Sequence, residues 1–230
     1  MEPAFWRQRW QANKIGFHLE EVNPYLIEHW PRLAIAEGAR VFVPLCGKSV
    51  DMRWLLEQGY QVEAIELSEL AIEQFFAEQG LDYAKEESES DEYDGWLSFK
   101  AANIRIWCGD FFELSKEQIG PIDAVYDRAA LIALPEEMRR AYVQQLLTLT
   151  GPVPQFLITL NYDQGQMEGP PFAVSNSEVN GLYQAAYGEI TGPDVEIDVL
   201  PGHGHFAARG LTGLHECVYL LPAATQVSKK

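Results

Sequence analysis

Residues 41–66 contain the side chains whose types and spacing best suit ligand binding. The apolar run Val41–Leu45 leads to Gly47, and the apolar run 62–65 ends at the acid Glu66. A Gly turn lets backbone N–H groups approach a ligand closely, beside the positive end of a helix. A carboxylate at the tip of a strand accepts hydrogen bonds from the two vicinal hydroxyls of a ribose. The pattern predicts a site for a ribose-bearing ligand, although an ordinary strand–helix–strand unit with a surface Glu is the alternative.

The elements that must position these residues are a strand, a Gly turn, a helix and a second strand. The helix is predicted to begin near Ser49 and to end at Gly59, in a left-handed conformation. This order is typical of the first βαβ unit of a nucleotide-binding sheet. The turn has one Gly where the dinucleotide fingerprint has three, and Val43 occupies the place of the first P-loop Gly. S-adenosylmethionine, which carries a ribose without phosphates, therefore fits better than a dinucleotide.

Two further strand ends carry side chains that suit binding. Asp110 and Phe111 follow the strand predicted at 104–107, where an acid could accept a hydrogen bond from the adenine amine and a ring could stack on the base. Asp127 and Arg128 lie at the carboxyl end of the strand predicted at 122–126. Ligands of open α/β sheets bind at this edge. A structural ion pair is the alternative for Asp127 and Arg128.

The N-terminal segment, residues 1–30, is rich in aromatic residues. Trp6 and Trp10 are four residues apart and so share one face of a helix. A helix that only buries two indoles is one interpretation. A lid over an organic ligand is the other.

Composition limits the class of protein and its partners. The chain has 230 residues, 47% of them apolar, which suits a single α/β domain over residues 1–230. A net charge of −17 argues against nucleic acid and anionic membranes as partners. Three widely spaced cysteines form neither a disulfide framework nor a metal motif, and neither a signal peptide nor a membrane span is found. We expect a soluble protein of the cytoplasm.

Two polar segments of the chain are predicted to have a structural role and not a ligand-binding one. Residues 86–94 include six acids and are predicted to form an acidic surface loop. His203, His205 and His215 lack the Cys or carboxylate partners of a metal site, so no metal is expected.

The strands predicted at 195–199 and 217–221 are expected to pair in an antiparallel fashion. The predicted fold is the α/β, Rossmann-like fold of class I S-adenosylmethionine-dependent methyltransferases, with a mostly parallel seven-stranded sheet and an antiparallel C-terminal hairpin.

Motifs along nearly the whole chain resemble those of the thiopurine S-methyltransferase family, especially its bacterial branch. They are Phe5-Trp6 with Arg9-Trp10, Gly16-Phe17-His18, Val41 to Ser49, Glu66-Leu67-Ser68, Asp127-Arg128-Ala129-Ala130-Leu131 and Gly169-Pro170-Pro171-Phe172. The turn Pro44-Leu45-Cys46-Gly47-Lys48 is unusual among methyltransferases, so the resemblance is specific.

The resemblance implies a role for each candidate residue. The S-adenosylmethionine site would be formed by Trp6, Trp10, Leu45, Gly47, Glu66, Asp110, Phe111 and Arg128. Glu66 would bind the ribose, and Arg128 would lie near the methionine end or the methyl acceptor. Phe17 would lie beside the acceptor, and Arg209 would belong to a late loop that borders it.

The activity that the resemblance implies is S-methylation of thiopurines or aromatic thiols by direct in-line transfer. Asp127 would orient Arg128, which would steady an anionic acceptor. Bacterial relatives are also associated with methylation of tellurium and selenium species, which would detoxify them. We expect a monomer whose partner is a small-molecule thiol or chalcogen. A nicotinamide-dependent oxidoreductase and a methyltransferase-like domain without catalysis are the alternatives.

Overall fold

The computed structural model describes residues 3–88 and 95–223, and the chain divides into two compact units, residues 1–124 and 125–230. The α/β fold is confirmed, with parallel central strands and antiparallel edge strands. The sheet has nine strands, so the prediction of seven was wrong. The single methyltransferase domain over residues 1–230 stays a prediction.

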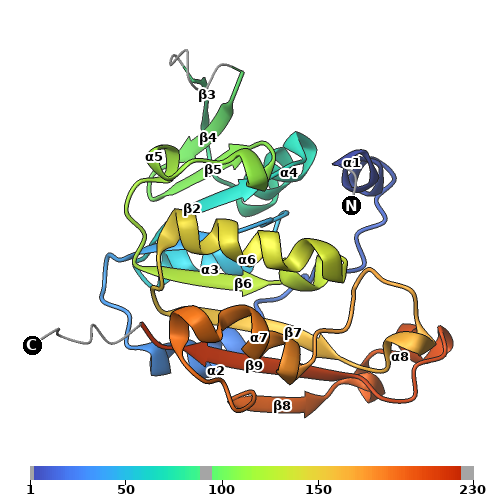
Figure 1. Cartoon of the computed structure of the whole chain (residues 1–230). Coiled ribbons are helices and arrows are strands. Elements are labelled where there is room, and N and C mark those ends of the chain that lie inside the picture. The colour runs from blue at the N-terminus through green and yellow to red at the C-terminus, as the bar shows by residue number, and fades with distance from the viewer. Residues whose placement is uncertain (1–2, 89–94, 224–230) are drawn as a thin grey trace, which may run out of the picture. The chain divides into compact units, whose positions relative to one another are not determined.

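The first unit contains five strands, ordered β3-β4-β5-β2-β1 (Figure 1). They are Arg40–Val43 (β1), Gln61–Glu66 (β2), Ala84–Glu87 (β3), Leu97–Ala101 (β4) and Ile104–Cys108 (β5). Strand β2 pairs in parallel with both β1 and β5, and Glu66 lies opposite Cys108. The carboxyl ends of β2 and β5 therefore meet at one edge, as the sequence predicts for Glu66 and Asp110.

Strand β3 explains one of the additional strands. It pairs antiparallel with β4 and includes Glu86 and Glu87, which were predicted to begin the acidic loop. All four of its residues are exposed, so no alternation of apolar side chains marks it in the sequence. Residues 89–94 of the predicted loop lie outside the described residues.

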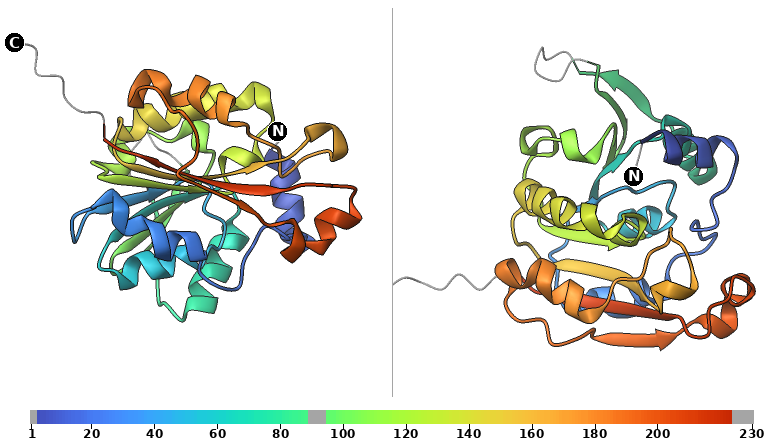
Figure 2. Two further views of the ribbon diagram at one scale, coloured as in Figure 1. Left: turned by 90° about the horizontal axis from the view of Figure 1, so that it is seen from below. Right: turned by 45° about the vertical axis from the view of Figure 1, so that its right-hand side comes forward.

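The first unit contains seven helical segments in the described residues, and the helix predicted from near Ser49 to Gly59 spans Asp51–Glu57. They are Pro3–Gln11 (α1), Pro24–His29 (α2), Trp30–Leu33 (η1), Asp51–Glu57 (α3), Glu69–Gln79 (α4), Phe111–Glu113 (η3) and Lys116–Ile119 (α5). Ser68 caps α4 by accepting from Ala71 N–H, and Gly80 ends it with a φ of 62°. Helices α3 and α4 lie on one face of β1 and β2 (Figure 2).

The second unit contains four strands, ordered β6-β7-β9-β8. They are Ala124–Arg128 (β6), Gln155–Asn161 (β7), Val195–Asp198 (β8) and His215–Leu221 (β9). β6 and β7 are parallel, whereas β9 is antiparallel to β7 and β8. The antiparallel C-terminal hairpin is confirmed, and Asp127 and Arg128 are the last two residues of β6.

Helices α6 (Glu136–Thr150) and α7 (Asn176–Tyr187) cover one face of β7 and β9 (Figure 2). The buried residues of α6 include Tyr142, Leu146 and Leu149, which follow helical spacing. Shorter turns of helix are Leu131–Ala133 (η4), Gln164–Gln166 (η5), Leu200–Gly202 (η6) and Gly204–Ala208 (α8). None of the helices in the described ranges is both long and apolar enough to cross a membrane.

Candidate functional site

The carboxylate of Glu66 organises the turn that follows β1. Its Oε2 accepts a hydrogen bond from Gly47 N–H at 2.8 Å, and its Oε1 accepts one from Ser68 N–H at 2.8 Å. In addition, Cys46 N–H donates to the carbonyl of Ile65 at 2.9 Å. Through these bonds, the end of β2 connects the turn after β1 to the start of α4. The predicted ribose-binding carboxylate of Glu66 and the predicted Gly turn therefore lie side by side.

The backbone of this turn is strained. Leu45 has a φ of 46° and Gly47 a φ of 54°, both in the left-handed region, which is unusual for a leucine. Such strain concentrates at binding sites, where the surrounding structure maintains it. Lys48 contributes to that support, because its Nζ lies 2.5 Å from Glu78 Oε1 of α4 and its side chain is only 10% exposed.

Three aromatic side chains of the N-terminal segment lie over the turn. A Cβ built on Gly47 would lie 3.0 Å from Cζ2 of Trp10, a tight contact, and the φ of 54° also favours glycine here. Phe17 makes edge contacts with both indoles, at centroid distances of 5.8 Å from Trp6 and 5.5 Å from Trp10. Trp10 is buried, whereas Trp6 and Phe17 are half-buried. The structure therefore brings all three predicted aromatic residues together at the Gly turn.

Asp110 and Phe111 lie at the end of β5, beside Glu66. Gly109 N–H donates to the backbone carbonyl of Glu66 at 3.0 Å. Oδ1 of Asp110 caps η3 by accepting from Phe112 N–H at 2.9 Å, and Phe111 is buried. The second carboxylate oxygen of Asp110 is the one suited to an adenine amine. Trp96, which the sequence analysis did not select, covers Gly109 so closely that a Cβ there would lie 2.4 Å from its ring.

Burial sets the electrostatics of this site. It raises the pKa of Glu66, while the N–H groups of Ser68, Gly47 and Leu67 lower it. Burial also raises the pKa of the Cys46 thiol, and the neighbouring Glu66 raises it further. Cys46 is therefore a neutral thiol at physiological pH. Of the two groups, the Glu66 carboxylate is the better acceptor for hydrogen bonds from a ligand.

These residues fit the cofactor predicted from the sequence. The Glu66 carboxylate accepts hydrogen bonds from the backbone N–H groups of Gly47, Ser68 and Leu67, and a carboxylate has about four acceptor positions, so acceptor capacity is left for a ribose. Gly47 is buried and donates its N–H to Glu66, and the Trp10 ring supplies an apolar cover over it. The chemistry of this donor and acceptor set suits a nucleoside without phosphates.

In the second unit, Asp127 is completely buried at the end of β6. Its Oδ2 accepts from the hydroxyl of Tyr142 at 2.7 Å, and its Oδ1 accepts from Leu131 N–H at 3.3 Å. Burial raises the pKa of Asp127 to about 6, although both hydrogen bonds lower it. Tyr142 was not among the predicted site residues, because helical spacing does not reveal a hydroxyl partner.

The turn that carries Arg128 is also strained. Ala129 follows it with a φ of 62°, and Asp127 holds the far side of the turn through Leu131 N–H. Arg128 itself is half-buried. Its predicted role toward a ligand stays a prediction.

Arg209 lies in the predicted late loop and joins it to a second loop. Its Nη2 donates to the carbonyl of Glu168 at 2.9 Å, and Thr212 N–H donates to Gln166 Oε1 at 3.0 Å. Glu168 directly precedes the Gly169-Pro170-Pro171-Phe172 motif. Arg209 is exposed, and its predicted contact with an acceptor stays a prediction.

The histidines of the same loop pack on aromatic rings. His205 lies 4.1 Å from Phe206 between ring centroids, and Nδ1 of His203 lies 2.8 Å from the carbonyl of Val199. Over the ranges 3–88 and 95–223, no group of three or more His, Cys, Asp or Glu side chains is arranged to hold a metal ion.

Comparison with known proteins decides the family. Residues 1–224 match the sequence profile of the thiopurine S-methyltransferase family. The chain belongs to the thiopurine S-methyltransferase family. A thiopurine S-methyltransferase of Nitrosospira multiformis is 46% identical over 98% of this chain and 100% of its own length. Another from Pseudomonas fluorescens is 47% identical over 96% of this chain and 99% of its own.

Solved structures agree with the fold. The Burkholderia thailandensis 1,6-didemethyltoxoflavin-N1-methyltransferase superposes with a TM-score of 0.61 at 16% identity, over 96% of this chain and 87% of its own. An Anabaena variabilis S-adenosylmethionine-dependent methyltransferase gives 0.56 at 15% identity, over 94% and 93%. The chain is thus a methyltransferase that uses S-adenosylmethionine, which rules out the oxidoreductase alternative.

Proposed function

We propose that this thiopurine S-methyltransferase family member transfers the methyl group of S-adenosylmethionine to thiopurines or other aromatic thiols. The observation that supports this most is the Glu66 carboxylate, which is held 2.8 Å from Gly47 N–H beneath the indole of Trp10. This combination suits a nucleoside that binds through its ribose hydroxyls. The presence of both Glu66 and the lid aromatics argues against a domain that binds without catalysis.

The residues of the first unit would hold the cofactor. Glu66 would accept hydrogen bonds from the ribose hydroxyls, and Leu45 and Gly47 would present the turn backbone. Asp110 and Phe111 would contact the adenine. Trp6 and Trp10 would exclude water from the bound molecule, and Phe17, which packs between them, would contact the acceptor.

The chemistry needs little from the protein beyond positioning. Bound S-adenosylmethionine would supply an activated methyl group on its sulfonium, for in-line transfer to a thiolate. Aromatic thiols ionise readily, so a dedicated general base is not required. Arg128 would steady the anionic acceptor, and Asp127 would support the turn that presents it, through Tyr142 and Leu131. Arg209 would border the acceptor from its own loop.

Composition supports the remaining proposals. Three free cysteines suit a reducing compartment such as the cytoplasm. A net charge of −17 disfavours nucleic acid and anionic membranes, which leaves a small molecule as the partner of a monomer. Selenium and tellurium species, as soft nucleophiles, are the second class of acceptor that we propose, with detoxification as the consequence.

Paired acceptors test the proposed activity. With methyl-labelled S-adenosylmethionine, we expect methylation of 6-mercaptopurine and thiophenol, and none of hypoxanthine and phenol, which carry oxygen in place of sulfur. Selenite and tellurite are assayed in parallel. Transfer to the oxygen compounds, or to none of these acceptors, would overturn the assignment.

Replacement of Arg128 tests its proposed role. Arg128→Ala should lower kcat/KM for an anionic thiol roughly 100-fold, because an electrostatic contact to the reacting group is lost, while thermal unfolding stays near that of the wild type. Arg140→Ala, which removes an exposed arginine of α6, is the matched control and should not change kcat/KM. Unchanged kinetics in Arg128→Ala would exclude the proposed contact.

A further inference from the structure

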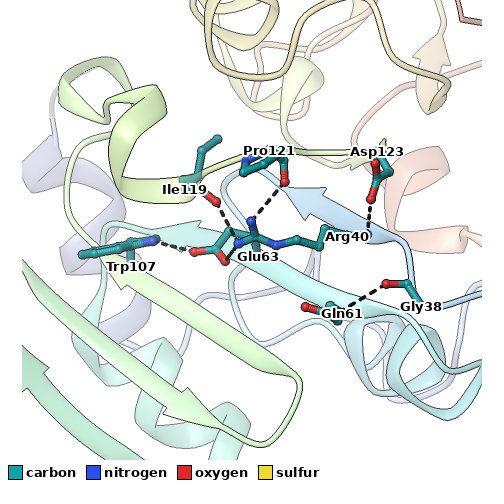
Figure 3. A network of polar contacts seen from close by, with 8 residues as sticks. All are labelled: Gly38, Arg40, Gln61, Glu63, Trp107, Ile119, Pro121 and Asp123. Carbon is teal, nitrogen blue, oxygen red and sulfur yellow. Dashed lines mark hydrogen bonds and ion pairs between the residues drawn. The ribbon is translucent and has the colours of Figure 1, made fainter.

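A charged network crosses three strands of the first unit (Figure 3). Glu63 lies in the middle of β2 with its side chain only 4% exposed. Its Oε1 accepts from the indole Nε1–H of Trp107 in β5 at 2.7 Å. Its Oε2 accepts from Nη2 of Arg40, the first residue of β1, at 2.6 Å. One carboxylate therefore connects three adjacent strands.

The guanidinium of Arg40 extends this network to the segment after α5. Nη2 also donates to the carbonyl of Ile119 at 2.8 Å, and Nη1 donates to that of Pro121 at 3.1 Å. Gly120, between them, has a φ of 67°, and a Cβ there would lie 2.9 Å from Nη1. The backbone thus approaches Arg40 as closely as glycine permits.

The two ends of the network enclose one continuous stretch of chain. Trp107 directly precedes residues 108–119, and the carbonyl of Ile119 is the last atom of that stretch that Arg40 contacts. Within the stretch, Asp110 caps η3 and Ser115 forms a capping box with Gln118. Both ends of a short, internally hydrogen-bonded segment are therefore fixed to the same ion pair.

Stability alone is a weak explanation for this arrangement. Replacing a buried ion pair with apolar residues of similar size is often neutral or stabilising, because two charges must lose their hydration. Burial raises the pKa of Glu63, which is the signature of that cost, and Trp107, Arg105 and Arg40 lower it. A buried pair can instead specify the relative position of the segments that it joins.

We propose that Arg40 and Glu63 are positioning residues for the cofactor's adenine, because they fix both ends of residues 108–119, which carry Asp110 and Phe111. The inference rests on the proposed function, in which Asp110 accepts a hydrogen bond from the adenine amine. Neither Arg40 nor Glu63 touches the base in this account. They set where Asp110 lies relative to Glu66, whose carbonyl accepts from Gly109 N–H.

Adenine selectivity is the readout that a merely structural role would not change. Calorimetry would compare S-adenosylhomocysteine with its inosine counterpart, in which an oxo group replaces the adenine amine. The wild type should prefer the adenine compound at least about tenfold, the value of one hydrogen bond to a charged acceptor. Trp107→Phe, which removes the indole N–H donor, should bring this preference close to one. Arg40→Lys, which cannot reach both carbonyls and Glu63 at once, should do the same.

Arg139→Lys in the second unit is the matched control. Arg139 is more buried than Arg40, with its side chain 3% exposed against 27%, and it likewise donates to a backbone carbonyl, that of Leu134 at 2.9 Å, and pairs with a glutamate, Glu178 at 2.7 Å. This variant should lose a similar amount of stability and keep the wild-type adenine preference. Thermal unfolding of the wild type and the three variants identifies any variant that fails to fold. If Trp107→Phe or Arg40→Lys does not fold, the adenine preference of the other one tests the proposal.

The outcomes separate the two proposals. Wild-type preference in a folded Trp107→Phe or Arg40→Lys protein would overturn the positioning role alone. Equal binding of both compounds by the wild type would also overturn it, because Asp110 would then not read the amine. A wild type that binds neither compound would overturn the proposed function, and the positioning role with it.

Discussion

Glu66 and Asp127 are both buried carboxylates at the carboxyl end of a strand, yet their partners differ. Glu66 accepts from backbone N–H groups, those of Gly47, Ser68 and Leu67, and keeps acceptor capacity for a ligand. Asp127 accepts from the Tyr142 hydroxyl and from Leu131 N–H and is 0% exposed. At the residue scale, Glu66 is the carboxylate that we propose binds the ribose, whereas Asp127 supports the strained turn at Ala129.

The pH dependence of stability tests the burial of Asp127. The pKa of this group is about 6 in the folded protein, against an ordinary value of 3.8, so the folded state holds the proton over a wider range. Between these values the folded state binds more protons than the unfolded state, and stability falls as pH rises. Compared with Asp127→Asn, the wild type should lose about 3 kcal/mol of unfolding free energy from below about pH 4 to above about pH 6.

Urea unfolding of both proteins at several pH values measures this difference. Glu63 and Glu66, whose pKa values are also raised, are present in both proteins and cancel in the comparison. A difference that does not change with pH would mean that Asp127 does not titrate in this range.

At the scale of elements, helix α1 packs directly against the turn after β1. Trp10 of α1 contacts Gly47, and Gly47 donates to Glu66 at the tip of β2. The lid is therefore packed directly on the residues that would hold the ribose. A change at Gly47 should act on both.

Two glycine variants separate backbone strain from this contact. Gly47 and Gly80 both have positive φ, at 54° and 62°, but only Gly47 has a neighbour that a Cβ would strike. Gly47→Ala and Gly80→Ala should each lose about 1 kcal/mol of stability to left-handed strain. Only Gly47→Ala should shift the Trp10 indole resonance in NMR spectra and weaken binding of S-adenosylhomocysteine. Equal effects of the two variants would contradict the packing of Trp10 on the turn.

Several elements could be predicted from the sequence because a local signal marks them. The βαβ unit around Gly47 and the C-terminal hairpin each combine apolar spacing with turn residues. Strand β3 has neither signal, since all four of its residues are exposed, and its partner β4 alone determines it. This accounts for one of the two strands by which the strand number was underestimated.

The candidate site shows the same division. Glu66, Gly47 and Asp110 could be found because they follow apolar strands, and the register of β2 with β5 confirms that these strand ends are adjacent. Tyr142, Trp96 and the Arg40–Glu63 pair were missed because their partners are distant in sequence. A charged residue inside the apolar run 62–65 was nevertheless a signal, because such a residue is rarely buried without a partner.

At the scale of the whole molecule, the charge of −17 should influence how the cofactor associates. S-adenosylmethionine carries a net positive charge, whereas S-adenosylhomocysteine, which lacks the sulfonium, is neutral overall. Raising the salt from about 10 to about 150 mM should slow association of the former on the order of threefold and change the latter much less. Stopped-flow fluorescence measures both rates, and identical salt dependence would argue against electrostatic attraction by the protein.

The most direct test of the account is the contact between Glu66 and the ribose. By calorimetry, wild-type protein should bind S-adenosylhomocysteine and not NAD, and Glu66→Gln should bind it roughly 10- to 100-fold more weakly. The 2′-deoxy form should bind the wild type more weakly but lose little further affinity in Glu66→Gln, because the same hydrogen bond is already absent. Glu57→Gln, at an exposed glutamate of α3, is the control. Unchanged affinity in Glu66→Gln, or equal binding of NAD, would show that Glu66 does not bind the ribose of S-adenosylmethionine.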